Sequence, residues 1–386
     1  MLAITNAKVY TIANGVIDGG TVLVDGGKIV AVGKGLTVPT SAEVIDAKGM
    51  TLTPGLIDAH THLGIHEEGI GFEGSDVNEM TEPVTPQMRA IDGINPEEEG
   101  LHDAYRHGVT AAWVAPGSAN VIGGQGCTIR TYGRTVDDMI LKEFSGLKCA
   151  TGENPKRVYN AKNKMPMTRM GTAALFREWF FKAKEYMRKQ AQAKAEGKEP
   201  EYDFKLEPIV AVLRKEVPMR VHAHRHDDIM TVFRIAREFD VEFTIEHATE
   251  GHKIADYMAA EPRLRGVTVG PTLSSRSKYE LRDKTFETPG AMQRAGVKTA
   301  IITDHPVVPI EYVVTAAAYA VKAGMDPDEA LRALTQNAAD ICLVGDRIGS
   351  IEVGKDADLA LFTGHPLDLP SECVLAVVAG EVVYRK

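Results

Sequence analysis

The segment from Pro54 to Gly64 constrains the fold most, because a short apolar run there ends in two histidines separated by one residue. Pro54-Gly55 predicts a turn that leads into a strand. Side chains alternate faces along an extended strand, so His60 and His62 point to the same side, about 6 to 7 Å apart along the backbone. Two such imidazoles can bind one divalent ion, although an isolated pair is more often structural. A metal site therefore requires further ligands elsewhere in the chain.

Length and composition indicate a globular protein of one large domain or two or three ordinary ones. The 386 residues are 44% apolar and 25% charged, and the net charge of −9 argues against nucleic acid or an anionic membrane as the main partner. We expect no membrane-spanning helix and no signal peptide, because neither a long apolar run nor a basic leader is present. The scattered cysteines predict free thiols and a cytoplasmic location; they are Cys127, Cys149, Cys342 and Cys373.

Both ends of the chain have the character of short strands. Asp25-Gly26-Gly27 separates two apolar runs and predicts a hairpin. Comparable runs near the C-terminus cover residues 357–362, 374–379 and 382–384. Neither end has enough strands for a core of its own. The sequence therefore predicts a small discontinuous β-sandwich domain made from residues 1–53 and 347–386.

Residues 54–346 alternate short strands with helices, which is typical of repeated βα units around a parallel sheet. After the opening strand, the expected strands are 109–114, 146–151, 219–221, 242–245, 266–269 and 298–303, with an eighth from 127–131 or 135–141. This pattern predicts an α/β fold, a (β/α)8 TIM-type barrel, whose chemistry would lie at the carboxyl ends of the strands.

Two segments interrupt this alternation. Residues 120–126 are rich in glycine, but they lack the Gly-Lys-Ser/Thr ending of a phosphate-binding loop. Residues 172–196 predict one long helix with an apolar stripe that faces the core or another subunit, made of Leu175, Trp179, Ala183, Met187 and Ala191. Neither segment indicates a cofactor site.

Further metal-binding side chains follow other expected strands. These are His222, His247, Asp304 and, slightly beyond its strand, Glu153. Any single one could be a helix cap or a turn residue. Several strand ends that each offer a ligand are harder to explain without a metal, since a barrel would bring them together.

The sequence resembles the amidohydrolase superfamily of metal-dependent hydrolases, and within it the imidazolonepropionase-like branch. The resemblance rests on Pro-Gly-Leu-Ile-Asp-x-His-x-His at 54–62, the later strand-end histidines, Thr-Asp-His-Pro at 303–306, and the segment 349–359. These elements occur in order from about residue 7 to the C-terminus. The stretch from Gly152 to Arg157 resembles a subgroup of unknown substrate.

The resemblance implies a role for each matching residue. His60 and His62 would bind the more buried metal, the two later histidines would also face metal, and Asp304 would touch metal and take a proton from the attacking water. Many relatives bridge two metals with a carboxylated lysine on a middle strand. Lys148 is one candidate for that bridge and Glu153 is the preferred substitute, so one or two ions are expected.

The expected activity is hydrolysis of a C–N bond in an amide, a dipeptide or a cyclic amide. A divalent ion lowers the pKa of water toward about 7 and so supplies hydroxide at neutral pH. Zn2+ suits imidazole and carboxylate ligands, and Fe, Mn or Ni would also fit. Asp304 would act as general base and then pass the proton to the leaving nitrogen.

Substrate recognition is expected from residues on loops that follow strands, namely Arg225, Arg157, Tyr159, Arg276 and Lys278. His224, two residues after His222, is expected either to contact substrate or to bind metal. A planar guanidinium suits a substrate carboxylate, which favours a small carboxylate-bearing amide. Two other functions stay open: deamination of an aromatic amine, disfavoured because His222-Ala223-His224-Arg225 lacks a His-x-x-Glu pattern, and a metal-free scaffold. Such barrels often form homo-oligomers.

Overall fold

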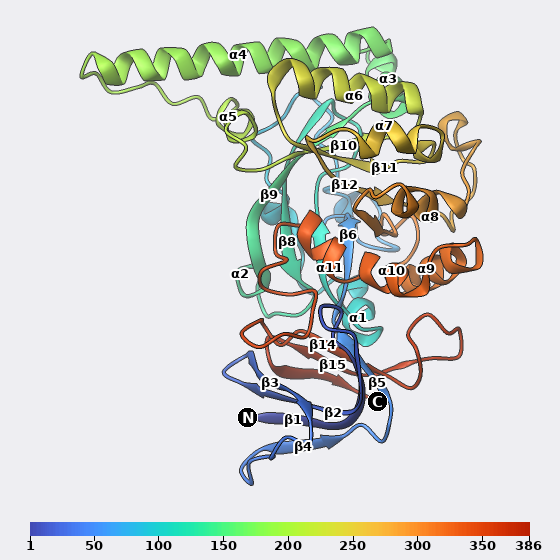
Figure 1. The fold of residues 1–386 in the computed structure, drawn as a ribbon. Helices are drawn as coiled ribbons and strands as arrows, with labels where there is room; N and C mark the ends of the chain where they lie inside the picture. The colour runs from blue at the N-terminus through green and yellow to red at the C-terminus, as the bar shows by residue number, and fades with distance from the viewer.

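The computed structural model describes residues 1–386 and contains two eight-stranded sheets (Figure 1). The first sheet comprises β1 (Leu2–Tyr10), β2 (Val16–Asp25), β3 (Lys28–Lys34), β4 (Glu43–Asp46), β5 (Thr51–Pro54), β14 (Leu359–Phe362), β15 (Cys373–Val378) and β16 (Glu381–Arg385). Its order is β16-β15-β14-β5-β1-β2-β3, and β4 pairs with β1. Strands from both chain ends therefore form one sheet, joined where β14 runs antiparallel to β5. Their arrangement as a sandwich stays a prediction.

The second sheet is the nearly closed barrel that positions the site. It comprises β6 (Leu56–Thr61), β7 (Val109–Val114), β8 (Ile122–Arg130), β9 (Ile140–Ala150), β10 (Met219–Ala223), β11 (Phe243–His247), β12 (Leu264–Val269) and β13 (Thr299–Ile301). These strands follow one another in sequence order around the sheet, from β6 to β13. Asp58 links the two edges, because its Oδ2 accepts a hydrogen bond from the backbone N of Thr303 at 3.0 Å.

The barrel departs from a regular (β/α)8 pattern at β8. This strand runs antiparallel to both of its neighbours, β7 and β9, whereas the other strands are parallel. Parallel neighbours need a crossover of a dozen or more residues. Residues 115–121 and 131–139 are too short for that, so the chain turns back on itself on each side of β8. The eighth strand therefore overlaps the expected segment 127–131, but it runs antiparallel to its neighbours and not parallel to them.

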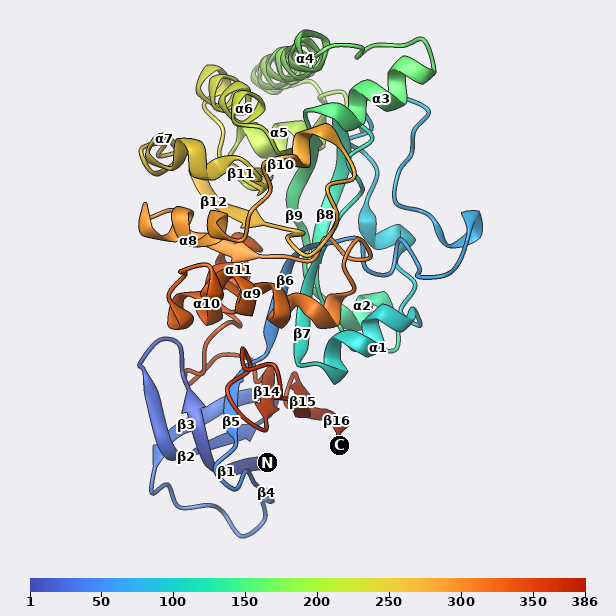
Figure 2. The same ribbon diagram turned by 90° about the vertical axis from the view of Figure 1, so that its right-hand side faces the viewer.

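The helices pack around the outside of the barrel. They are α1 (Glu99–Arg106), α2 (Val136–Met139), α3 (Glu153–Ala161), α4 (Arg169–Ala195), α5 (Glu207–Leu213), α6 (His226–Phe239), α7 (Ala255–Ala259), α8 (Glu287–Arg294), α9 (Val313–Lys322), α10 (Pro327–Ala333) and α11 (Gln336–Ile341). Figure 2 shows α6, α7, α8 and α10 stacked along one side of the barrel, as successive βα units require. No helix has both the length and the apolar character needed to cross a membrane.

The long helix expected near 172–196 is α4, which has 27 residues and projects beyond the rest of the molecule (Figure 1). Leu175 and Ala183 of its expected apolar stripe are buried, together with Phe176 and Phe180. These side chains belong to the core cluster that also contains residues of β9, β10 and α6. The core-facing interpretation of the stripe is therefore confirmed for the first half of the helix.

A buried ionic cluster joins the barrel to the first sheet. Arg130, the last residue of β8, donates from Nε to both oxygens of Asp358 at 3.2 Å and from Nη2 to Asp356 at 2.7 Å. The same Asp356 oxygen accepts a hydrogen bond from Arg347 at 2.7 Å. Both aspartates precede β14, so these contacts link the two sheets through charged groups that are almost fully buried.

We expect Arg130→Met to destabilise the protein by about 3 to 5 kcal/mol, because it leaves Asp358 buried without its cation. Chemical denaturation followed by circular dichroism measures this loss as a lower midpoint. Arg134→Met is the matched control, since Arg134 follows the same strand but is exposed. Equal stability of the two variants would show that the ionic cluster makes no net contribution to the stability of the protein.

Candidate metal centre

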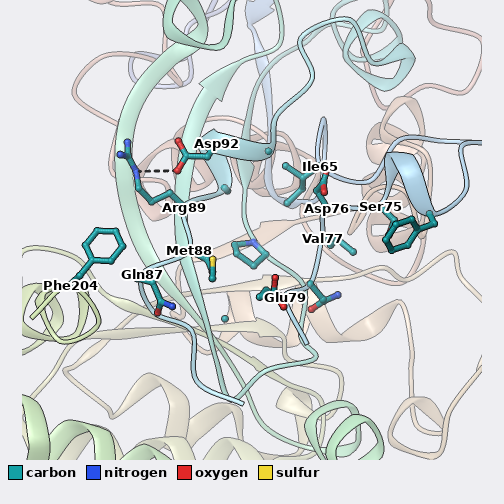
Figure 3. Close-up of a pocket in the computed structure, with 16 residues that line it drawn as sticks. Ile65, Ser75, Asp76, Val77, Glu79, Gln87, Met88, Arg89, Asp92 and Phe204 are labelled. Atoms are coloured by element: carbon teal, nitrogen blue, oxygen red, sulfur yellow. Dashed lines mark ion pairs between the residues drawn. The ribbon is translucent and has the colours of Figure 1, made fainter. Parts of the chain in front are cut away.

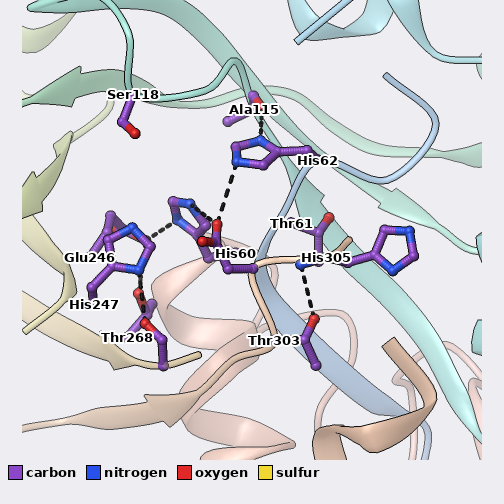
Figure 4. Close-up of polar contacts among 12 residues, drawn as sticks. His60, Thr61, His62, Ala115, Ser118, Glu246, His247, Thr268, Thr303 and His305 are labelled. Atoms are coloured by element: carbon purple, nitrogen blue, oxygen red, sulfur yellow. Dashed lines mark hydrogen bonds and ion pairs between the residues drawn. The ribbon is translucent and has the colours of Figure 1, made fainter. Parts of the chain in front are cut away.

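The carboxyl ends of the barrel strands bring most of the predicted ligands together. They come from five strands or the residues just after them: His60 and His62 (β6), Lys148 (β9), His222 (β10), His247 (β11) and Asp304 (β13). Figure 4 shows the rings of His60, His62 and His247 pointing toward a common region, while His305 points away from it. The convergence expected from a barrel is therefore present at this end of the sheet.

His60, His62 and Asp304 have the spacing of ligands to one ion. Nε2 of His60 and Nε2 of His62 each lie 3.4 Å from Oδ1 of Asp304. That separation exceeds an ordinary hydrogen bond. It matches the about 3.3 Å between ligand atoms around a tetrahedral ion with bonds of about 2.0 to 2.1 Å. His247 lies within the same group, in which the ligand atoms of His60, His247 and Asp304 are all within 4.8 Å of one another.

The other ring nitrogen of each of these histidines is already bonded. Nδ1 of His60 lies 2.6 Å from Oε2 of Glu246, and Nδ1 of His62 lies 2.8 Å from the Ala115 carbonyl oxygen. Nδ1 of His247 lies 2.8 Å from the Gly270 carbonyl oxygen. These acceptors require the proton on Nδ1, so Nε2 keeps its lone pair and faces the site. Metal-binding histidines are usually oriented in this way, and the residues present therefore fit a divalent ion.

Glu246 is held by a fully buried arginine. Arg220 donates to Oε1 from Nε at 3.0 Å and to Oε2 from Nη2 at 2.9 Å, and its guanidinium lies 3.6 Å from the centre of the Trp113 ring. Burial opposes ionisation of Glu246, but Arg220 and the hydrogen bond with His60 hold its pKa well below the usual value. The sequence signal for this support is a charged residue inside each of two buried strands.

The backbone is strained where two ligands leave their strands. Asp304 has φ of +57° and His247 has φ of +72°, conformations that side chains with a Cβ seldom adopt. Such strain is common at functional sites, where surrounding contacts maintain it. Burial opposes ionisation of Asp304, but the nearby imidazoles of His247 and His62 lower its pKa, so it is a carboxylate at neutral pH.

Lys148 and Glu153, the two candidates for the bridging position, occupy different places. Nζ of Lys148 lies 3.1 Å from Nε2 of His60, and the residue is 1% exposed. Burial lowers the pKa of Lys148 to about 8. Glu153 begins α3 and contacts Glu280, whose Oε2 accepts from the Glu153 backbone N at 3.0 Å. Lys148 is therefore inside the histidine cluster, whereas Glu153 contacts its margin through another acidic residue.

His224 joins the cluster, beside His222. Ligand atoms of His222, His224 and His247 lie within 4.8 Å of one another, and all three residues are buried. Nδ1 of His224 lies 2.7 Å from the Thr249 hydroxyl oxygen. The sequence left His224 open as a metal ligand or a substrate contact. Glu280, which lies against these histidines, was not predicted, because it is on a loop well beyond the end of β12.

Most of the other residues expected to contact substrate have their polar groups engaged elsewhere. Arg225 pairs with Asp227 at 2.7 Å, and Arg276 donates to the carbonyl oxygens of Arg282 and Lys284 at 3.0 Å. The Tyr159 hydroxyl lies 2.5 Å from both the Glu82 carbonyl and Asn120 Oδ1, and Arg157 is exposed. Lys278 differs from them, because its Nζ lies 2.8 Å from Oε1 of Glu280, which lies 3.6 to 3.7 Å from His222 and His224.

A cavity of about 780 Å3 lies beyond the ends of β6 and β7, and none of the histidines of the site lines it (Figure 3). It is lined by Ile65, three residues after His62, and by Pro116, next to the carbonyl that binds His62. Its other lining residues include Asp76, Glu79, Gln87, Met88, Arg89, Asp92 and Phe204. The volume is sufficient for a small-molecule substrate.

The barrel and its histidines offer a possible site for a divalent ion, and comparisons with known proteins identify the family of the chain. The profile of the Amidohydrolase family matches residues 51–383. The chain is 30% identical to amidohydrolase tasK of Hapsidospora irregularis over 94% of its own length, but it spans only 39% of that protein. It is 27% identical to an imidazolonepropionase of Sphingopyxis alaskensis over 95% of this chain and 92% of that one.

Among solved structures, an amidohydrolase from Thermotoga maritima superposes with a TM-score of 0.96 and 45% identity over the whole of both chains. A Xaa-Pro dipeptidase has the same fold at 18% identity, with a TM-score of 0.61. The chain belongs to the amidohydrolase family, the class of hydrolases that act on carbon–nitrogen bonds.

Proposed function

We propose that this chain is a metal-dependent hydrolase that cleaves a C–N bond in a small amide, dipeptide or cyclic amide. The observation that supports this most is the group of His60, His62, His247 and Asp304, in which the three imidazoles are buried and present Nε2 to the same region. Neutral imidazoles with a carboxylate form the ligand set that Zn2+ prefers. The named relatives, amidohydrolase and imidazolonepropionase, agree with this class of reaction.

A bound ion would lower the pKa of the attacking water and polarise the carbonyl of the substrate. The other steps belong to the chain itself. Asp304 accepts the proton from the water at its carboxylate and donates it to the leaving nitrogen, so one residue serves both halves of the reaction. Asp58 keeps Asp304 in place, because its Oδ2 accepts hydrogen bonds from the backbone N and the hydroxyl of the preceding Thr303.

Lys148, rather than Glu153, is proposed for the bridging position. Its ammonium nitrogen already lies against His60 inside the cluster, as described above. We expect Lys148→Ala to lose at least half of the bound metal and most of the activity, while Glu153→Gln keeps its metal. Elemental analysis of both purified variants tests this assignment. Metal loss from Glu153→Gln alone would restore Glu153 as the bridge.

Hydrolysis itself is tested by screening amides, dipeptides and cyclic ureides with chelator-treated protein before and after Zn2+ or Mn2+ is restored. The proposal predicts turnover of at least one C–N substrate class that disappears with the chelator and returns with the metal. The same screen includes aromatic amines. Ammonia release from those amines, without amide hydrolysis, would instead favour the deaminase alternative.

A further inference from the structure

His305 follows Asp304 in the chain but points away from the histidine cluster, so the proposed reaction gives it no role (Figure 4). We propose that His305 and Glu98 form a buried positioning pair that fixes the two segments carrying Asp304 and His62. This inference rests on the proposed function, because it concerns residues to which metal binding and proton transfer are assigned there. Both members of the pair act through those residues, and neither is itself a ligand.

The two side chains meet in the interior, between the start of α1 and the segment after β13. Glu98 directly precedes α1 and is 2% exposed, and His305 is 1% exposed. Nε2 of His305 lies 3.6 Å from Oε1 of Glu98, and neither atom makes a hydrogen bond. A buried polar atom is unfavourable without a partner. Each of these two atoms therefore depends on the other.

Glu98 holds the segment that follows His62. Its second oxygen, Oε2, accepts a hydrogen bond from the backbone N of Gly64 at 3.1 Å. Asn95, just before Glu98, donates from its backbone N to the Gly64 carbonyl oxygen at 2.8 Å. Both backbone groups of Gly64 are thus bound to the segment that leads into α1, which fixes the chain directly after His62.

His305 holds the segment that follows Asp304. Its carbonyl oxygen accepts a hydrogen bond from the backbone N of His62 at 2.9 Å, so the segments with the two ligands are bonded to each other. Its Nδ1 accepts a hydrogen bond from the backbone N of Ile310 at 3.2 Å. Because this nitrogen accepts, the proton of the ring is on Nε2, which faces Oε1 of Glu98.

Asp304 lies between two neighbours that are each held in place. Its φ of +57° is unfavourable for a residue with a Cβ, and such a conformation persists only where surrounding contacts maintain it. On one side, Thr303 donates to Asp58, as described above. On the other side, His305 is held by Glu98. Without this pair, the carboxylate of Asp304 would be fixed from one side only.

Gly100, in the first turn of α1, makes the close packing around the pair possible. A Cβ at this position would lie 2.7 Å from Nε2 of His305 and 2.9 Å from Oε1 of Glu98. Any larger residue would therefore push the two side chains aside. The approach of α1 to the pair requires glycine, and no other side chain of the helix stands between the two atoms.

The experiment uses Co2+ as a probe of the ligands, because its visible absorption changes with the geometry of the groups around it. Glu98→Gln keeps the size of the side chain but removes the carboxylate that faces His305. His305→Asn keeps an acceptor for Ile310 and cannot reach Glu98, whereas His305→Gln places an amide N–H near the position of Nε2. Glu99→Gln, the same change at the exposed neighbouring position, is the control.

Chelator-treated protein is titrated with Co2+, and circular dichroism checks that each variant is folded. Glu98→Gln and His305→Asn should each raise the Kd for Co2+ about tenfold and shift the absorption bands, as is usual when the support of metal ligands is removed. The double variant should be no weaker than either single variant, because the two residues act as one pair. His305→Gln and Glu99→Gln should keep the spectrum and the Kd of the wild type.

A purely structural role for the pair would lower stability and leave the Co2+ spectrum of the folded protein unchanged. Wild-type spectra and Kd values in Glu98→Gln and His305→Asn would therefore overturn the inference and leave the proposed function standing. Equal effects of His305→Asn and His305→Gln would also overturn it, and this comparison decides alone if Glu98→Gln does not fold. A wild type that binds no Co2+ would instead contradict the proposed function, and the inference with it.

Discussion

Asp304→Asn is expected to reduce kcat by about 100- to 10,000-fold, the range that a positioned general acid–base contributes. Asparagine has almost the same shape, and its amide oxygen can still face an ion where Oδ1 of Asp304 lies 3.4 Å from His60 and His62. The amide cannot accept the proton of the attacking water or return it to the leaving nitrogen. The variant should therefore keep its metal and lose its turnover.

Steady-state kinetics and metal analysis of the same preparation check this prediction together. Asp346→Asn is the matched control, because Asp346 is exposed. This variant should have a normal kcat and a normal metal content. Near-normal kcat in Asp304→Asn with metal bound would refute the proton-transfer role. Loss of metal along with activity would show that Asp304 acts mainly as a ligand.

Arg220→Met is expected to cost about 3 to 5 kcal/mol of unfolding free energy, because it leaves the carboxylate of Glu246 buried without a cation. Both side chains are fully buried, and Arg220 also donates to the Ala59 carbonyl oxygen at 2.6 Å. Urea denaturation measures the effect. Arg234→Met, on the exposed face of α6, is the control and should change stability by less than about 0.5 kcal/mol.

The double variant Arg220→Met with Glu246→Leu distinguishes two contributions to the free energy of unfolding. One is the loss caused by a buried charge without a partner, and the other is the net contribution of the ion pair. Replacing a buried ion pair by apolar residues is often neutral or stabilising, so the double variant should recover much of the lost stability. It should nevertheless bind metal less well, because His60 loses the acceptor that holds its Nδ1 proton. A double variant with normal metal affinity would contradict the supporting role given to Glu246.

Much of the barrel could be predicted because buried parallel strands are continuous apolar runs with polar residues where they end. This pattern located the strands that became β6, β7 and β9 to β13. It could not give the direction of β8, since an apolar run is the same in either direction. The direction depended on the short connections on each side of that strand.

The sequence predicted those ligands of the site that lie at the ends of strands. The resemblance favoured Glu153 over Lys148 because some relatives have a glutamate at the bridging position, whereas a lysine within an apolar run gives no indication of where its long side chain reaches. The pairing of Glu246 with Arg220 could not be predicted for a similar reason, since each residue lies inside a strand and its partner is on the neighbouring strand. Glu280 comes from a long loop, whose path is set by contacts such as that with Glu153.

Metal content of protein purified without chelator tests the central claim most directly. Elemental analysis should find between one and two equivalents of a transition metal per chain, and removal of the metal should abolish C–N bond hydrolysis. Less than about 0.2 equivalents, with no activation by added Zn2+ or Mn2+, would contradict the account and favour a scaffold that keeps the barrel without its metal chemistry.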